Sequence, residues 1–215
     1  MVEATASDGI QLEFSDARPA PKDLPSINAV LAEIGAGFWP LDLADEPAAI
    51  RALLAKPRLS DAEAERVKEH FLLSRERLVE TIERAGRRPG TLGGGQLQTF
   101  VSPHDYWYPQ LYVVQDEVDY GRFDRFHVNV PDEGAGVDEV LQLLSGGGLV
   151  VHLRSPRGET LTLRVDCPRP DAGWLGTYDG AIPHIGSLSG AQPGTKALVQ
   201  VIGPARWSMR YLDDG

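Results

Sequence analysis

From residue 97 to the C-terminal end, short stretches in which apolar and polar residues alternate follow one another, with Gly- and Pro-rich connections between them. Alternation with a period of two is typical of a strand that turns one face to a core and the other to a cavity or to water. Eight stretches have this character: residues 97–101, 110–114, 124–130, 140–144, 149–154, 160–166, 197–202 and 207–212. So many short strands with short connections predict a mainly β protein, a sandwich or a barrel.

The N-terminal part of the chain has a different periodicity. Apolar residues at helical spacing predict short helices over residues 26–34, where Ser26 can act as the N-cap, and over residues 46–54. Between these helices, residues 38–41 are interpreted as an apolar connector. Before them, a weak alternation over residues 10–14 predicts a short edge strand.

The clearest helix signal is the capping box formed by Ser60 and Glu63, in which each side chain can bond the backbone amide of the other residue. One helix is expected from here to Gly86, a residue suited to a C-terminal stop. Its apolar face consists of Val67, Phe71, Leu78 and Ile82. A helix with so narrow an apolar face needs a partner, so residues 1–95 are predicted to be a helical region that packs on a β-barrel formed by residues 96–215.

Length and charge limit the possible functions. A chain of 215 residues can form one substantial core with a buried site. A net charge of −10 argues against nucleic acid as a partner, because phosphate binding needs clustered Lys and Arg. The absence of a long apolar run and of a signal-peptide pattern, together with a single cysteine, Cys167, predicts a cytoplasmic protein without an internal disulfide or a membrane span.

Two motifs resemble those of the cupin family. His127 and Asn129 lie on one predicted strand, and Glu139 is followed by six residues and Gly146. The segment from Gly180 to His184 is similar to the second cupin motif. In cupins, a small β-barrel holds a divalent metal through two His and one Glu of the first motif and one His of the second. Here Asn129 stands where that family usually has the second His, and nine residues rather than about four separate it from Glu139.

This resemblance implies a cupin-like β-barrel or jelly roll in which His127, Glu139 and His184 bind a divalent transition metal, Fe, Mn, Ni or Zn. It implies an enzyme that acts on a small polar or anionic metabolite, and it leaves isomerase, lyase and dioxygenase open. The residues themselves add that His127 shares its strand face with polar Arg125 and Asn129, as expected for a polar lumen.

Candidate catalytic residues are His104, Tyr106 and Arg125. The first two belong to residues 103–109, where three aromatic residues stand beside a His and an Asp. Such a segment is typical of a binding lip or lid, and equally of a loop that packs over the end of the barrel. Arg125 is predicted to lie on the same strand face as His127.

Each candidate ligand also has an ordinary structural interpretation. His127 can belong to a solvent-facing strand, Glu139 can be a charged strand end, and His184 can be a packed loop histidine. A metal-free protein that binds a small ligand in the same cavity is therefore the alternative function. Exposed edge strands and the apolar residues 38–39 predict a homodimer in which these surfaces are covered.

Overall fold

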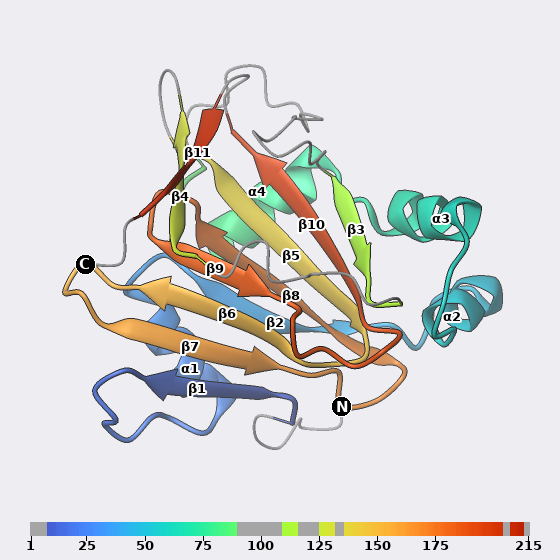
Figure 1. The fold of residues 1–215 in the computed structure, drawn as a ribbon, viewed down its shortest axis with the longest axis horizontal. Coiled ribbons are helices and arrows are strands. Elements are labelled where there is room, and N and C mark those ends of the chain that lie inside the picture. The colour runs from blue at the N-terminus through green and yellow to red at the C-terminus, as the bar shows by residue number, and fades with distance from the viewer. Residues whose placement is uncertain (1–7, 90–108, 116–124, 132–135, 204–206, 213–215) are drawn as a thin grey trace.

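The structure is a computed structural model that describes residues 8–89, 109–115, 125–131, 136–203 and 207–212. Within these ranges, eleven strands form two antiparallel sheets, and four helices accompany them (Figure 1). The predicted mainly β class is therefore confirmed. The described strands form two separate sheets that face each other, and among them no closed barrel is formed.

The first sheet has six strands in the order β1-β7-β6-β9-β4-β11. Their bounds are β1 Ile10–Phe14, β4 His127–Pro131, β6 Leu149–Arg154, β7 Thr160–Val165, β9 His184–Ser187 and β11 Trp207–Tyr211. The second sheet has five strands in the order β2-β8-β5-β10-β3. Their bounds are β2 Gly37–Asp42, β3 Gln110–Val113, β5 Asp138–Ser145, β8 Ala172–Asp179 and β10 Lys196–Ile202. The predicted edge strand over residues 10–14 is confirmed as β1, which pairs with β7.

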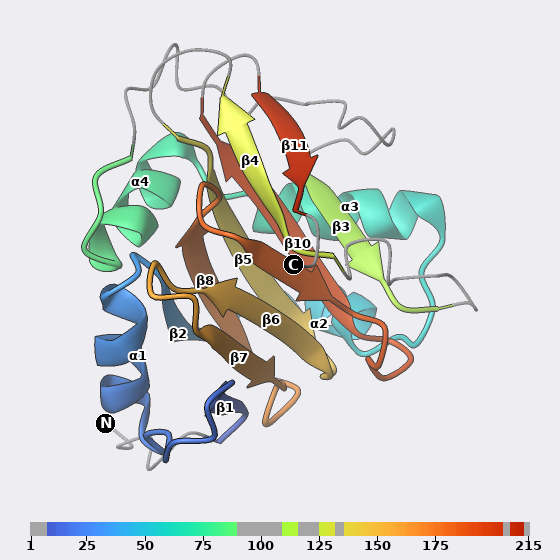
Figure 2. The same cartoon turned by 60° about the vertical axis from the view of Figure 1, so that its left-hand side comes forward.

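The helices are α1 Leu24–Ala32, α2 Ala48–Leu54, α3 Asp61–Phe71 and α4 Arg75–Arg84. Apolar residues of α1 join the main core between the sheets, and α1 lies beside the edge strands β1 and β2 (Figure 2). Helices α2, α3 and α4 pack on the outer face of the five-stranded sheet. The first 95 residues thus supply the four helices and one edge strand of each sheet. The boundary expected at residue 95 lies outside the described residues.

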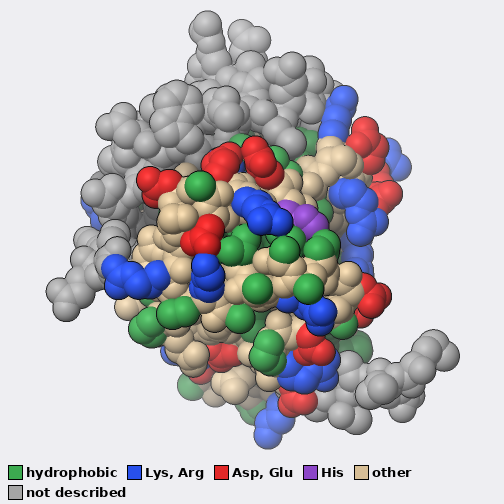
Figure 3. Space-filling view, turned by 90° about the vertical axis from the view of Figure 1, so that its right-hand side faces the viewer, with side chains coloured by type: hydrophobic (Ala, Val, Ile, Leu, Met, Phe, Trp, Pro, Cys, Tyr) green, Lys and Arg blue, Asp and Glu red, His purple; other side chains and the backbone are tan. Residues whose placement is uncertain are grey.

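The side of the molecule that carries α2 and α3 has acidic and basic side chains mixed with apolar ones (Figure 3). One polar contact on these helices joins His70 of α3 to Glu46, with 2.5 Å between Nε2 and Oε2. No helix in the described ranges is long and apolar enough to cross a membrane.

The residues predicted to be an apolar connector form strand β2, so that interpretation was wrong. β2 pairs with β8, and Phe38 lies opposite Gly176 with its side chain almost fully buried. Pro40 is tolerated in β2 because this strand lies at the edge of its sheet. β8 itself was not predicted, because Gly173 and Gly176 weaken the strand pattern of the sequence.

Gly176 is required by packing, since a Cβ at this position would lie 2.5 Å from the nearest ring atom of Phe38. Gly176 therefore weakens the strand pattern of β8 in the sequence and leaves the space for the Phe38 side chain in the folded protein.

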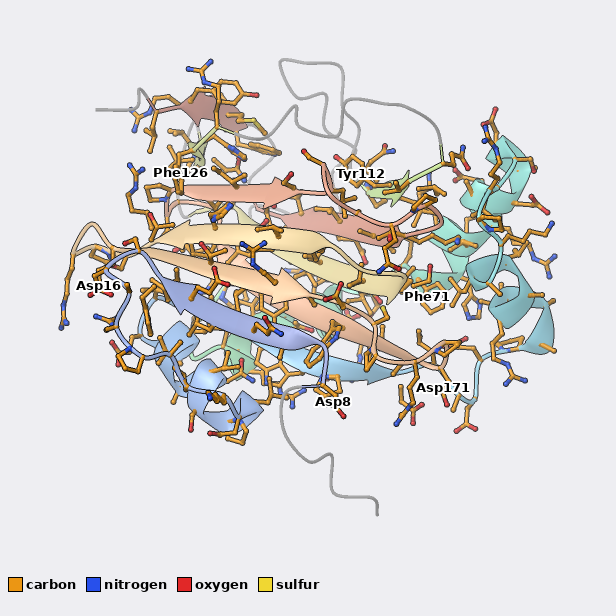
Figure 4. All side chains as sticks on the ribbon, turned by 60° about the horizontal axis from the view of Figure 1, so that its bottom comes forward. Asp8, Asp16, Phe71, Tyr112, Phe126 and Asp171 are labelled. Atoms are coloured by element: carbon orange, nitrogen blue, oxygen red, sulfur yellow. The ribbon has the colours of Figure 1, made fainter. Side chains whose placement is uncertain are left out.

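The capping box of Ser60 and Glu63 is confirmed, and Gly86 has the positive φ of a helix stop, +79°. The single helix expected between them is wrong: α3 ends at Phe71, and Ser74 caps α4. Phe71 lies between α3 and the sheet (Figure 4). The first helix also differs from the prediction, because its N-cap is Asp23 rather than Ser26.

Two buried glutamines of the five-stranded sheet explain the break between α3 and α4. The Gln200 side chain accepts a hydrogen bond from the Leu73 amide at 3.0 Å and donates one to the Leu73 carbonyl at 3.2 Å. Gln142 donates to the carbonyl of Phe71 at 2.8 Å. These side chains bond backbone groups that a continuous helix would have used internally.

Candidate metal centre

Three buried side chains from both sheets meet between the layers. His127 of β4 and His184 of β9 are register partners in the six-stranded sheet, so their side chains share its inner face. Glu139 of β5 projects toward them from the opposite sheet and reaches His184. The three side chains have exposed fractions of 3%, 1% and 6%, in the order given, and one possible ligand atom of each lies within 4.8 Å of the others.

The backbone orients both imidazole rings in the same way. Nδ1 of His184 lies 2.8 Å from the carbonyl oxygen of Ile182, and Nδ1 of His127 lies 3.1 Å from the carbonyl oxygen of Arg125. A carbonyl can only accept, so in each ring Nδ1 carries the proton and donates it. This is the arrangement of metal-binding histidines, in which a bond at one nitrogen makes the other the ligand atom.

Three groups contact the Glu139 carboxylate, and a fourth bonds the Glu139 backbone. Its Oε1 accepts a hydrogen bond from Nδ2 of Asn129 at 2.5 Å and lies 3.1 Å from Nε2 of His184. Its Oε2 accepts one from the hydroxyl of Tyr178 at 2.8 Å, and the Thr177 hydroxyl donates to the backbone carbonyl of Glu139 at 2.7 Å. Both carboxylate oxygens are therefore held in place.

Electrostatics set the protonation of the centre. Burial acts to raise the pKa of Glu139, but the charge and hydrogen bond of His184 outweigh it, so the net effect lowers that pKa. Burial likewise acts to lower the pKa of His184, and the Glu139 charge raises it overall. Burial, then the nearby His184, lowers the pKa of His127 to about 4. Burial also raises the pKa of the Tyr178 hydroxyl well above its ordinary value, which keeps its proton in place.

Without a metal, these pKa shifts favour an ionised Glu139 paired with a protonated His184, beside a neutral His127. The proton on Nε2 of His184 occupies the space between this nitrogen and Oε1 of Glu139. A metal ion that replaced this proton would find both donor atoms in place.

The donor atoms fit a divalent transition metal. Two ligands about 2.1 Å from one ion and at right angles to each other lie about 3 Å apart. The 3.1 Å between Nε2 of His184 and Oε1 of Glu139 matches this separation. Two imidazoles and one carboxylate also form a donor set used by iron, and each of these ligand types is known for zinc.

The fold is similar to that of a solved structure. That structure is described as acireductone dioxygenase from Bacillus anthracis with a cadmium ion in the active centre; the TM-score is 0.57 and the sequence identity 13%. The match covers 93% of this chain and 94% of that chain. The two chains share a fold. No protein-family model and no curated protein sequence matches this chain. At 13% identity the likeness extends to the fold alone.

The three predicted metal ligands are brought together, and their burial excludes the solvent-facing strand for His127 and the charged strand end for Glu139. His127 and Glu139 are interior residues rather than members of a solvent-facing strand or a charged strand end. His184 is the first residue of β9 and is buried against the other two. That these residues bind a metal remains a prediction.

The predicted catalytic residues have different positions. Arg125 precedes β4 and is exposed, so it does not share the buried strand face of His127 as predicted; its guanidinium lies 5.1 Å from the ring centre of Tyr211. The Tyr211 ring in turn meets His127 edge-on, with 5.9 Å between ring centres. Tyr211 therefore lies between the Arg125 guanidinium and His127, and the Arg125 side chain is connected to the centre only by this ring among the contacts described. His104 and Tyr106 lie outside the described residues.

Sequence reasoning missed Tyr178, which lies beside Glu139 in the sheet and bonds its carboxylate. The signal was present as an alternation of Trp174, Gly176 and Tyr178 along β8. A buried apolar cluster adjoins the centre, because Val201 pairs with Glu139 and Met209 pairs with Asn129 in their sheets. This cluster consists of Val137, Val201, Trp207 and Met209.

Proposed function

We propose that this protein is a cupin-like, metal-dependent enzyme that acts on a small polar or anionic metabolite. His127, Glu139 and His184 are its metal ligands, and Fe, Mn, Ni and Zn are the candidate ions. The proposal is carried by one observation: ligand atoms of these three buried residues, from two sheets, lie within 4.8 Å of one another. The fold likeness to a dioxygenase with a metal ion in its active centre supports it.

A bound ion would supply Lewis acidity and, if it is iron, electron transfer to or from a substrate. The chain supplies a fixed ligand set, because the carbonyls of Ile182 and Arg125 orient the rings while Asn129 and Tyr178 hold the carboxylate. Glu139 is the only anion in the ligand set, so a divalent ion there keeps one positive charge. That charge favours an anionic substrate.

Isomerase, lyase and dioxygenase remain the candidate reaction types. The similar fold belongs to a protein named as a dioxygenase, so oxygen consumption is the first activity to measure. Candidate substrates are small oxygen-rich anions, presented to protein loaded with Fe, Mn, Ni or Zn in separate experiments.

A metal-free protein that binds a small ligand is the second candidate, and one observation favours it. Both Glu139 oxygens already receive hydrogen bonds from protein groups, Asn129 and His184 at Oε1 and Tyr178 at Oε2. A buried carboxylate with these partners is stable without a metal.

Elemental analysis separates the two candidates, using protein purified without chelators and without a His-tag. We expect near-stoichiometric transition metal in the wild type and its loss in His184→Ala and His127→Ala, with secondary structure retained. His152→Ala is the matched control, because His152 bonds Thr162 on the neighbouring strand and contributes to no metal cluster among the described residues. Less than about a tenth of an equivalent, in protein that cannot be reloaded, would favour the metal-free function.

We further propose a cytoplasmic homodimer. The edge strands β1 and β2 each leave one side without a strand partner within the described residues, and pairing across a two-fold axis would cover such an edge. The single cysteine is in keeping with a reducing compartment. A monomer mass in light scattering at micromolar concentration would contradict the dimer.

A further inference from the structure

We propose that Asn129 is a fourth protein ligand of the ion at this centre, bound through its side-chain oxygen. This inference rests on the proposed function and adds one donor to it. It gives a role to a residue that is buried as deeply as the histidines, with an exposed fraction of 1%.

The orientation of the Asn129 amide follows from Glu139. Nδ2 lies 2.5 Å from Oε1 of Glu139 and donates a hydrogen bond to it. Turning the amide over would place its oxygen against the carboxylate, and two acceptors at that distance repel each other. Oδ1 is therefore the atom directed away from Glu139.

The Asn129 oxygen has no hydrogen-bond donor among the described residues, although it is inaccessible to water. A buried acceptor without a partner is unfavourable, and such atoms in native proteins commonly mark a missing ion, ligand or water. The nitrogen of the same amide is bonded to a candidate metal ligand, so the oxygen lies at the edge of the same centre. A metal ion there would satisfy it.

The backbone fixes Asn129 in this position. It follows His127 by two residues on β4, so both side chains project from the inner face of the sheet. The backbone N–H of Asn129 donates a hydrogen bond to the carbonyl of Gly180 at 2.7 Å. A Cβ at Gly180 would lie 2.7 Å from Nδ2 of Asn129, so glycine here leaves the space that the amide occupies.

An amide oxygen would change the properties of the site without changing its charge. The set of two imidazoles, one carboxylate and one neutral oxygen is suited to borderline and hard divalent ions such as Fe²⁺ and Mn²⁺, and poorly suited to Cu⁺. In an octahedral ion, four protein donors leave about two positions for water or substrate, whereas three leave about three.

The number of water molecules bound to the ion therefore tests the proposal. Mn²⁺ is added to metal-free protein, its dissociation constant is measured by calorimetry, and the bound waters are counted from the relaxation of water protons. We expect about two waters in the wild type and about one more in Asn129→Ala, with an affinity at least about tenfold weaker. Asn129→Asp keeps an oxygen at this position and should restore the wild-type number.

Tyr178→Phe is the matched control, because Tyr178 also donates a hydrogen bond to Glu139 but offers no atom to the ion in this scheme. If Asn129 only positioned Glu139, the two variants would both weaken Mn²⁺ binding and leave the water count unchanged. That result, or about three waters in the wild type, would overturn the inference while leaving the proposed function intact. The wild-type count needs no variant, so it decides the question even if Asn129→Ala does not fold. A wild type that binds none of the four candidate metals would instead refute the proposed function.

Discussion

Replacing Glu139 by Leu should have two separate consequences, one for stability and one for metal binding. The carboxylate accepts hydrogen bonds from Asn129 and Tyr178 and pairs with protonated His184, all buried. Leucine removes these acceptors together, and breaking a buried ion pair from one side typically costs about 3–5 kcal/mol. We therefore expect metal-free Glu139→Leu protein to lose about 3–5 kcal/mol of unfolding free energy.

Glutamine at the same position should cost less. Its amide oxygen can still accept from Asn129, and its NH₂ group can donate to the Tyr178 oxygen, so the main loss is the pairing with His184. We expect about 1–3 kcal/mol, because one interaction with a charged group is lost. Both variants should bind metal more weakly, Glu139→Leu because it offers no donor atom and Glu139→Gln because a neutral amide oxygen is a weaker ligand than a carboxylate.

Urea unfolding of the metal-free proteins and calorimetric titration with Zn²⁺ and Mn²⁺ measure these effects. Glu13→Leu is the control, because Glu13 lies on an exposed strand face and pairs only with the exposed Arg164 among the contacts described. It should change stability by no more than about 0.5 kcal/mol. Metal-free Glu139→Leu as stable as the wild type would refute the buried network, and unchanged metal affinity in this variant would refute Glu139 as a ligand.

Three other predictions follow from different parts of the fold. Gly176→Ala places a methyl group 2.5 Å from the Phe38 ring and should destabilise the protein by about 1–3 kcal/mol. In urea unfolding, adding Phe38→Leu to this variant should recover part of the loss. If the two substitutions instead lower the unfolding free energy additively, the contact is contradicted. The hydrogen bond from Lys56 to Glu63, together with the capping box, lowers the pKa of Glu63 from 4.5 to about 2. The stabilising effect of the ionised Glu63 carboxylate is therefore complete above pH 4.5 and is lost as the pH falls toward 2. The difference in unfolding free energy between the wild type and Glu63→Gln should shrink over this range in acid unfolding followed by circular dichroism. A constant difference would show that the carboxylate contributes nothing. Burial raises the pKa of the Cys167 thiol to about 12, so iodoacetamide at pH 8 should alkylate the folded protein much more slowly than the urea-unfolded protein, and equal rates would show that the thiol is not protected.

Local patterns determined much of the architecture from the sequence alone. Period-two alternation identified most of the strands, because the side-chain direction in a strand depends only on neighbouring positions. The capping box of Ser60 and Glu63 was equally local and was also confirmed. The same logic singled out His127, since its polar neighbours on one strand face indicated a polar interior.

Tertiary contacts decided what these patterns could not. The break after Phe71 depends on Gln142 and Gln200, which are distant in sequence and bond backbone groups between the two helices. Strand β8 forms because β2 and β5 pair with its two edges, although its glycines weaken the local strand signal.

The candidate site shows the same division. Its ligand types were visible in the sequence, but the interior position of Glu139 depends on the pairing of β5 with β8, which brings Tyr178 beside it. The orientation of Asn129 is set by a hydrogen bond across the two sheets. Such contacts join residues on different strands and different sheets, so only the pairing of the strands and the packing of one sheet on the other determine which polar side chains meet.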